Sequence, residues 1–99
     1  MNIFDLYLKK IIILIKKLNN EGLLELQTSL NQINVDIPPS NFDCDISTNV
    51  ALVLSKVNKK SPLDVANILT NLIKVADDEI EIISIAKPGF INIKFKPIY

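Results

Sequence analysis

The C-terminal segment constrains the fold most strongly, because it has the pattern of a β-hairpin. Residues 79–86 form an isoleucine-rich run, and residues 90–96 alternate between apolar and polar side chains. Between them, Lys87-Pro88-Gly89 has the composition of a tight turn, in which we expect Gly89 to adopt the positive φ of a type II turn. Adjacent isoleucines at 82 and 83 predict a bulge or two buried faces in the first strand.

The remainder of the chain is mostly helical by its pattern. Helical spacing of apolar residues predicts four helices, which run from about Asn2 to Leu18, from Leu23 to Leu30, from a cap at Asp45, Ser47 or Thr48 to about Asn58, and from the Ser61-Pro62-Leu63-Asp64 start signal to about Ile73. Ile33, Val35 and Ile37 alternate with polar residues as a short strand, which Pro38-Pro39 end before a loop from Ser40 to Ile46. We expect one α+β domain over residues 1–99, with a small, mostly antiparallel sheet and a C-terminal β-hairpin packed against about four helices.

The amino-acid composition argues against several functional classes for this chain. Eleven cationic residues balance eleven acidic ones, and every cation is Lys, so a strongly basic nucleic-acid binder is disfavoured and any RNA contact must be local. With no His and only Cys44, a zinc site and His-dependent triads lack their ligands and bases, and the lone thiol suits a reducing cytoplasm. The apolar run 11–15 is far shorter than the roughly 20 residues that span a bilayer. We therefore expect a cytoplasmic protein with no metal and no membrane contact.

Other charged clusters have simple structural interpretations. The lysines at 9, 10, 16 and 17 lie mostly off the apolar stripe, which favours a solvated helix face over phosphate contacts. Lys56, Lys59 and Lys60 suit the negative end of a helix. The acidic cluster at 77, 78, 79 and 81 has no metal-ligand spacing and is expected to solvate a turn.

The last strand carries the candidate site. If Ile91, Ile93 and Phe95 face the core, the opposite face presents Phe90, Asn92, Lys94 and Lys96. An exposed aromatic ring can stack on an unpaired base, an amide can bond a base edge, and Lys can meet phosphates. The alternative is structural: Phe90 caps the core, and the two lysines protect an edge strand.

Four motifs in order resemble a known family. They are Pro38-Pro39, Asp45-Ile46-Ser47-Thr48-Asn49-Val50-Ala51, Ser61-Pro62, and Lys87-Pro88-Gly89-Phe90-Ile91-Asn92. Over nearly the whole chain this order resembles the additional N-terminal domain of arginyl-tRNA synthetases, whose pattern is a proline-containing loop, Gly-Asp-aromatic-small-Thr-Asn-Val-Ala, a capped helix, and Pro-Gly-Phe/Tyr-X-Asn. Cys44 and Ile46 stand where the family usually has Gly and an aromatic residue, so the loop before the helix is expected to differ in shape.

The resemblance implies an α/β module that grips the outer corner of tRNA. The family's nucleotide-contacting aromatic and amide fall on Phe90 and Asn92, whereas Lys94 and Lys96 are added from strand geometry alone. The implied partners are the D-loop of tRNA(Arg) and the remainder of a synthetase chain, with no membrane and no DNA. Asp45, Thr48 and Asn49 are interpreted as capping and loop-fixing residues.

The family's adenylate-forming chemistry needs a dinucleotide-fold domain with His- and Lys-containing motifs, which 99 residues without His cannot supply. We therefore expect a non-catalytic fragment that needs no cofactor, with ATP and Mg²⁺ serving the full-length arginine–tRNA ligase. The competing hypothesis is a stand-alone protein-interaction module that uses the hairpin edge or the first helix. A reading frame that continues into a nucleotide-binding domain would exclude that alternative.

Overall fold

The fold is a four-stranded antiparallel sheet with helices on one face. The structure is a computed structural model that describes residues 2–26, 29–38 and 43–97. Its elements are α1 (Ile3–Asn20), the 3-10 helix η1 (Ser29–Gln32), β1 (Val35–Asp36), β2 (Ile46–Thr48), α2 (Val50–Asn58), α3 (Pro62–Ala76), β3 (Ile80–Ala86) and β4 (Phe90–Phe95). The strand order is β1-β2-β4-β3. The predicted α+β class, the antiparallel sheet and the C-terminal hairpin are confirmed.

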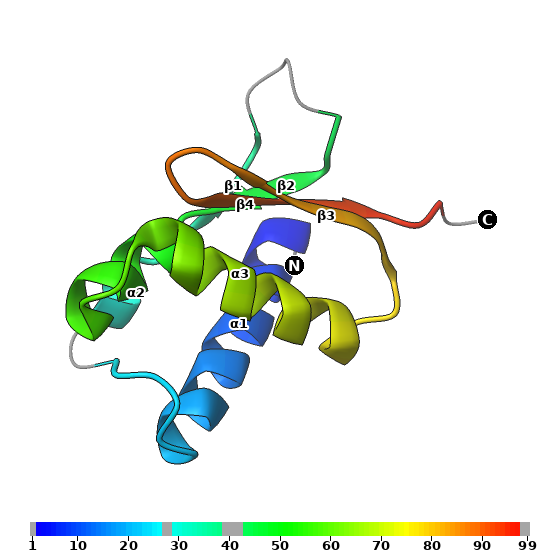
Figure 1. Cartoon of the computed structure of the whole chain (residues 1–99). Helices are drawn as coiled ribbons and strands as arrows, with labels where there is room; N and C mark the ends of the chain where they lie inside the picture. Colours follow the sequence, from blue (N-terminus) through cyan, green and yellow to red (C-terminus); the bar gives the residue numbers. More distant parts are fainter. Residues whose placement is uncertain (1, 27–28, 39–42, 98–99) are drawn as a thin grey trace.

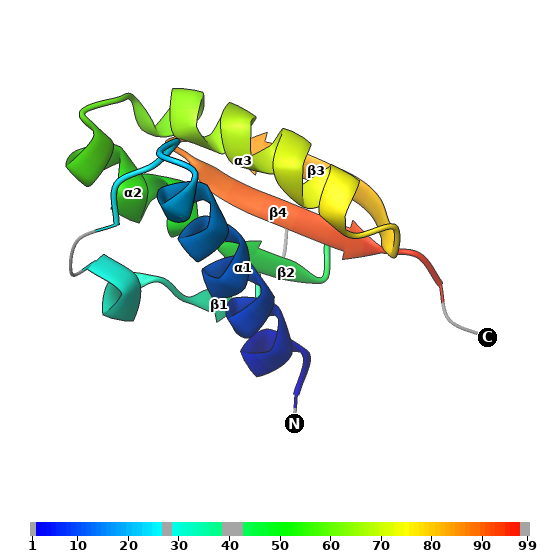
Figure 2. The ribbon, with the colours of Figure 1, turned by 90° about the horizontal axis from the view of Figure 1, so that it is seen from below.

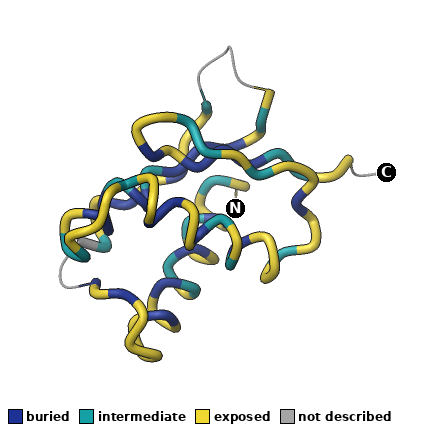
Figure 3. Tube along the Cα trace, in the orientation of Figure 1, coloured by how far each residue is buried: buried dark blue, intermediate teal, exposed yellow. Residues whose placement is uncertain are grey.

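The helices lie together on one side of the sheet, whereas the other side carries no helix among the described residues (Figure 1). Figure 2, seen from below, shows α1 and α3 lying across the sheet. The buried residues gather where helices and sheet meet (Figure 3). Fully enclosed side chains come from every part of this layer, and they include Ile15, Ile46, Leu54, Leu69, Ile91 and Ile93, each at 0% exposure. The sheet therefore has one apolar face and one open face.

Local chemistry explains the helix starts. The Asn2 side chain accepts a hydrogen bond from the Asp5 N–H at 2.9 Å and caps α1. Ser61 accepts from the Asp64 N–H at 3.1 Å, with Pro62 in the first turn of α3, in agreement with the predicted start signal. No helix in the described part of the chain is long and apolar enough to cross a membrane.

The prediction of a helix from Leu23 to Leu30 is wrong, and the described residues hold three α-helices instead of four. Residues 23–26 are not helical, and 27 and 28 lie outside the described residues. Side chains hold this backbone: Asn19 donates to the Leu24 carbonyl at 2.7 Å, and Asn58 both accepts from the Glu25 N–H and donates to the Glu25 carbonyl. Leu24 and Leu26 are buried from an irregular segment.

The strand β2 departs from the sequence prediction. The pattern assigns residues 46–48 to a loop and a helix cap, but they pair with β1 on one side and β4 on the other. The predicted strand over residues 33–37 is confirmed only at Val35–Asp36. Two or three residues are too short for an alternation to be recognised, and residues 39–42 of the predicted loop lie outside the described residues.

The hairpin itself matches the prediction in all but its turn. Of the two expectations for the first strand, a bulge or two buried faces, the register shift between Ile80 and Ile82 supports the bulge. Gly89 does not have the positive φ of a type II turn, and the Lys87–Pro88 peptide is cis. Gly89 is required for another reason, because a Cβ at this position would lie 2.6 Å from the Cβ of Pro62.

Candidate nucleic-acid interface on the open face of the sheet

The register of the sheet places a polar row across its open face. Asp36 pairs with Ser47, Ser47 with Asn92, and Asn92 with Ser84, so one residue comes from each of the four strands. Directly paired residues on neighbouring strands share a face. The next row, which starts at Val35 and includes Thr48 and Ile91, belongs to the buried face.

The small side chain of Ser47 leaves a hollow in this row. Neighbouring strands lie about 4.8 Å apart, so the backbones at Asp36 and Asn92 are separated by roughly 10 Å with only a hydroxymethyl group between them. The resulting cavity has a volume of about 350 Å³ and is lined by Asn34, Asp36, Ile37, Ser47, Ala86, Lys87, Phe90 and Asn92. We call it the Asn92 hollow. Its width suits one flat aromatic group the size of a nucleobase.

Asn92, which lines this hollow, has a buried acceptor without a partner in the described part of the chain. The residue is only 3% exposed, and its Oδ1 has no hydrogen-bond partner among the described residues. A buried polar atom without a partner costs about 1–3 kcal/mol, so such atoms are rare in native proteins. The strand alternation instead predicts an amide displayed at the surface. Asn92 is buried because β4 is a central strand, with β2 and β3 flanking it on both sides.

Phe90 lies at the edge of the same hollow, 38% exposed, in agreement with the alternation of β4. Ile91 and Ile93 are fully buried on the other face, and Phe95 packs edge-on against Tyr7 with ring centroids 5.3 Å apart. The ring of Phe90 and the carboxamide of Asn92 therefore line one cavity, in which a planar ligand can meet both.

The two predicted lysines do not line the hollow. Lys94 Nζ forms an ion pair with Asp43 Oδ2 at 2.9 Å, and this hydrogen bond and the charge of Asp43 raise the pKa of Lys94. Lys96 follows β4, where its N–H donates to the Glu79 carbonyl at 2.8 Å. The cation that does line the hollow is Lys87, which the sequence pattern assigns only to the turn. Its position three residues before Phe90 is the signal that could have found it.

Asp45, Thr48 and Asn49 have structural roles, as predicted, but the N-cap of α2 is Asn49, without a side-chain capping bond, and not Asp45, Ser47 or Thr48. Asp45 Oδ2 accepts from the Phe95 N–H at 2.8 Å, and Thr48 Oγ1 accepts from the Val50 N–H at 3.2 Å at the start of α2. Asn49 holds the wall of the hollow, because its Oδ1 accepts from the Asn34 N–H at 2.8 Å and its Nδ2 donates to the Gln32 carbonyl at 2.9 Å.

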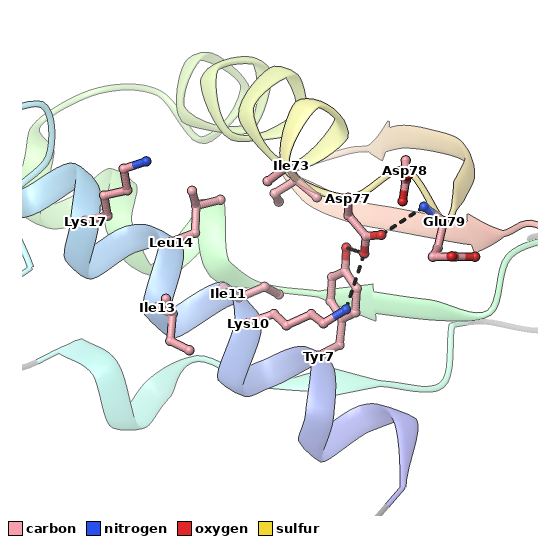
Figure 4. A pocket seen from close by; sticks show the side chains of 11 residues that line it. Tyr7, Lys10, Ile11, Ile13, Leu14, Lys17, Ile73, Asp77, Asp78 and Glu79 are labelled. Atoms are coloured by element: carbon pink, nitrogen blue, oxygen red, sulfur yellow. Dashed lines mark hydrogen bonds and ion pairs between the residues drawn. The ribbon is translucent and has the colours of Figure 1, made fainter.

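A separate pocket of about 540 Å³ lies between α1 and the α3–β3 turn (Figure 4). Asp77 accepts there from the Tyr7 hydroxyl at 3.1 Å and from the Glu79 N–H at 3.0 Å, with Lys10 Nζ 3.8 Å away. The sequence predicts only that Asp77 solvates a turn. It instead connects α1 to the turn that precedes β3, and these internal bonds give its oxygens a structural role.

Within the described part of the chain, Cys44 has no activating partner. Burial, followed by the charges of Asp45 and Asp43, raises the pKa of the Cys44 thiol. A thiol with a raised pKa is a poor nucleophile at neutral pH, which agrees with its lack of basic neighbours in the sequence.

Comparisons with known proteins agree with the motif order. A family profile described as "Arginyl tRNA synthetase N terminal domain" matches residues 5–95. The arginine–tRNA ligase of Pelagibacter ubique (strain HTCC1062) is 79% identical over 99 residues, which is all of this chain and 17% of that ligase. The ligase of Rhodopseudomonas palustris (strain HaA2) is 41% identical over 80 residues, 81% of this chain and 13% of the ligase. That of Wolbachia pipientis (subsp. Culex pipiens, strain wPip) is 38% identical over 96 residues, 97% of this chain and 16% of the ligase.

The chain therefore spans between 13% and 17% of the length of these relatives. No solved structure matches it. Because the profile covers residues 5–95 and a 79% identical relative matches every residue, the chain belongs to the family of arginyl-tRNA synthetase N-terminal domains.

Proposed function

We propose that the Asn92 hollow binds one unpaired nucleotide of an RNA loop. The ring of Phe90 stacks on the base, and Asn92 Oδ1 accepts a hydrogen bond from a base N–H. The observation that carries the proposal is the buried, unpartnered oxygen of Asn92 beside an exposed aromatic ring in one cavity. Stacking on aromatic side chains combined with hydrogen bonds to base edges is how proteins recognise single-stranded RNA loops.

Family membership supports a tRNA as the RNA in this proposal, because the relatives are arginine–tRNA ligases. We propose that the loop is the D-loop of tRNA(Arg), as the motif resemblance implies, and that residues 1–99 act as a docking domain of a longer ligase. That ligase joins arginine to its tRNA with ATP and Mg²⁺, while this domain contributes affinity and no catalytic group. The remainder of the synthetase chain is the second partner.

Lysines around the hollow neutralise phosphates. Lys87 lies at the hollow itself, and Lys94 and Lys96 lie further along the chain from Asn92, toward nucleotides that continue past it. Lys94 has to exchange its ion pair with Asp43 for a phosphate, which is feasible because the Asp43 side chain is 90% exposed and the pair is therefore weak.

The decisive variant is Asn92→Leu, which keeps the shape of the side chain and removes its polar atoms. If the amide of Asn92 serves RNA binding and not the fold, the free energy of unfolding of this variant should exceed that of the wild type by about 1–2 kcal/mol. The reason is that the substitution removes an unsatisfied buried acceptor. It should also weaken binding to a D-arm stem-loop RNA by about 1–3 kcal/mol, as should Phe90→Ala, the scale of one lost base contact. Fluorescence anisotropy measures the affinity, and urea denaturation measures the stability.

Asn71→Ala is the matched control, because Asn71 is exposed on α3 and lies on the helical side of the sheet. It should change neither measurement. The proposal fails if Asn92→Leu destabilises the fold and binds the stem-loop like the wild type, since the amide would then serve the structure alone.

A further inference from the structure

A second hollow adjoins the Asn92 hollow. Its volume is about 600 Å³, and it shares three lining residues, Asn34, Asp36 and Phe90, with the first. Phe90 therefore borders both cavities. The opposite wall of the second hollow comes from α2 and the start of α3, where Lys56 and Pro62 line it.

The close approach of Gly89 to Pro62 explains why the two hollows are contiguous. Because Gly89 has no Cβ, the β3–β4 turn packs directly against the first residue of α3. This contact brings Phe90, which follows the turn, to the side of α2 that carries Lys56. A larger residue at position 89 would push the turn and the ring away from α2.

The chemistry of the second hollow suits a nucleotide. Leu52, Pro62 and Phe90 offer apolar surface to a base, and Asn34 offers an amide. Lys56 is exposed, is the one cation among the residues that line the cavity, and forms no ion pair within the described part of the chain. An aromatic ring beside a lysine is the combination that proteins use to bind successive nucleotides of a single strand.

We infer that this second hollow holds the neighbouring nucleotide of the same unpaired loop, with Lys56 Nζ on the phosphate that joins the two nucleotides. The inference rests on the proposed function of the Asn92 hollow. In this arrangement Phe90 separates two nucleotide subsites, and Lys56 contacts the RNA. The alternative role for Lys56 is structural, because a cation in the last turn of α2 stabilises the helix dipole.

The test compares Lys56→Gln with Lys60→Gln in the 99-residue chain. Lys60 is the matched control, because it is exposed just beyond the same helix and lines neither hollow. The ligand is a D-arm stem-loop RNA, and a second set of stem-loops carries one uncharged methylphosphonate linkage at each loop position in turn. The affinity of each protein for each RNA is measured between about 50 and 300 mM salt, a range over which phosphate contacts change affinity strongly.

We expect Lys56→Gln to weaken binding about two- to fivefold, as for an exposed ion pair. It should also reduce the slope of log K against log salt by about 0.7, the value for one phosphate of a single strand. On one of the methylphosphonate RNAs the substitution should have no further effect, because its phosphate partner is already neutral. For Lys60→Gln, no methylphosphonate position in the loop should cancel the effect of the substitution.

Equal effects of Lys56→Gln and Lys60→Gln on every RNA would overturn the inference. The loss of affinity would then come from the change in net charge and not from a specific phosphate contact. The same holds if Lys56→Gln leaves affinity unchanged while Asn92→Leu abolishes it, and in that case the Asn92 hollow alone would remain as the site. If Asn92→Leu binds like the wild type, the proposed function fails and the second subsite fails with it.

Discussion

Gly89 shows at the residue scale how one absent methyl group positions a site. The sequence suggests backbone freedom as the reason for this glycine, yet its φ is not in the left-handed region. The tight space against Pro62 is the actual constraint, because a Cβ would lie only 2.6 Å from the Pro62 Cβ and 3.4 Å from its backbone. The sequence alone does not distinguish a glycine required by tight packing from a glycine required by a positive φ.

This distinction gives a stability prediction. Gly89→Ala should lower the free energy of unfolding by about 1–3 kcal/mol, because the turn must move away from Pro62. It should also weaken RNA binding, because Phe90 moves with the turn. Urea denaturation and stem-loop affinity are the measurements.

Gly22→Ala is the control, because Gly22 has a φ of 77° and a Cβ added there would have no atom within 4 Å. Its cost of about 1–2 kcal/mol comes from the left-handed backbone, so RNA affinity should stay unchanged. A Gly89→Ala protein as stable as the wild type would mean that the turn has room to adjust.

At the scale of elements, α1 is joined to the sheet by a buried phenol. Tyr7 is 2% exposed, and its hydroxyl donates to Asp77 Oδ2 at 3.1 Å in the turn before β3. Burial, followed by the charge and the hydrogen bond of Asp77, raises the pKa of Tyr7 above its usual value of 10.0. The buried hydrogen bond between Tyr7 and Asp77 thus favours the protonated phenol in the folded protein.

The direction of this shift predicts a pH dependence. Because the folded-state pKa is higher than the unfolded one, the contribution of Tyr7 is complete below about pH 10 and is lost as the pH rises further. Tyr7→Phe should be less stable than the wild type at pH 8 by about 1 kcal/mol, the value of one hydrogen bond. The difference should shrink at pH 11, because only the wild type loses this contribution.

Urea denaturation of both proteins at the two pH values measures the effect, and groups common to both cancel in the comparison. Stability curves that stay parallel from pH 8 to 11 would show that the Tyr7 hydroxyl titrates alike in the folded and unfolded chains.

Elements with strong local signals are predictable, and short ones are not. The helices α1 and α3 carry long apolar stripes and side-chain caps, and the β3–β4 hairpin has two long runs around a turn. By contrast, β2 has three residues and depends on β1 and β4 for its pairing. The segment after α1 has leucines enough for a helix, but Asn19 and Asn58 hold its backbone in another conformation.

At the scale of the whole molecule, the helices occupy one face of the sheet, and no helix of the described residues covers the other face (Figure 1). The four lysines of α1 at positions 9, 10, 16 and 17 are exposed on the helical side. Near the two hollows the lining cations are only Lys87 and Lys56 among the described residues. With a net charge of zero, the chain lacks a long-range attraction that would add to these contacts.

We therefore predict a shallow salt dependence for RNA binding. The four phosphate contacts proposed on a single strand, those of Lys56, Lys87, Lys94 and Lys96, give a slope of log K against log salt of about −2.8. Lys16→Gln, on the helical side, should leave this slope unchanged. A slope steeper than about −4 would mean that several further lysines, such as those of α1, contact the RNA.

The sequence by itself determined the helices with capped amphipathic patterns, the C-terminal hairpin with its bulge, and the order of motifs that marks the family. These features depend on residues close together along the chain, where periodicity and capping chemistry act. Only the tertiary structure decided that Asn92 is buried with a free acceptor, that Ser47 leaves a hollow beside it, and that Lys87 replaces Lys94 at its rim. The reason is that the sheet joins strands distant in sequence, and a side chain's exposure depends on the neighbours that these strands supply.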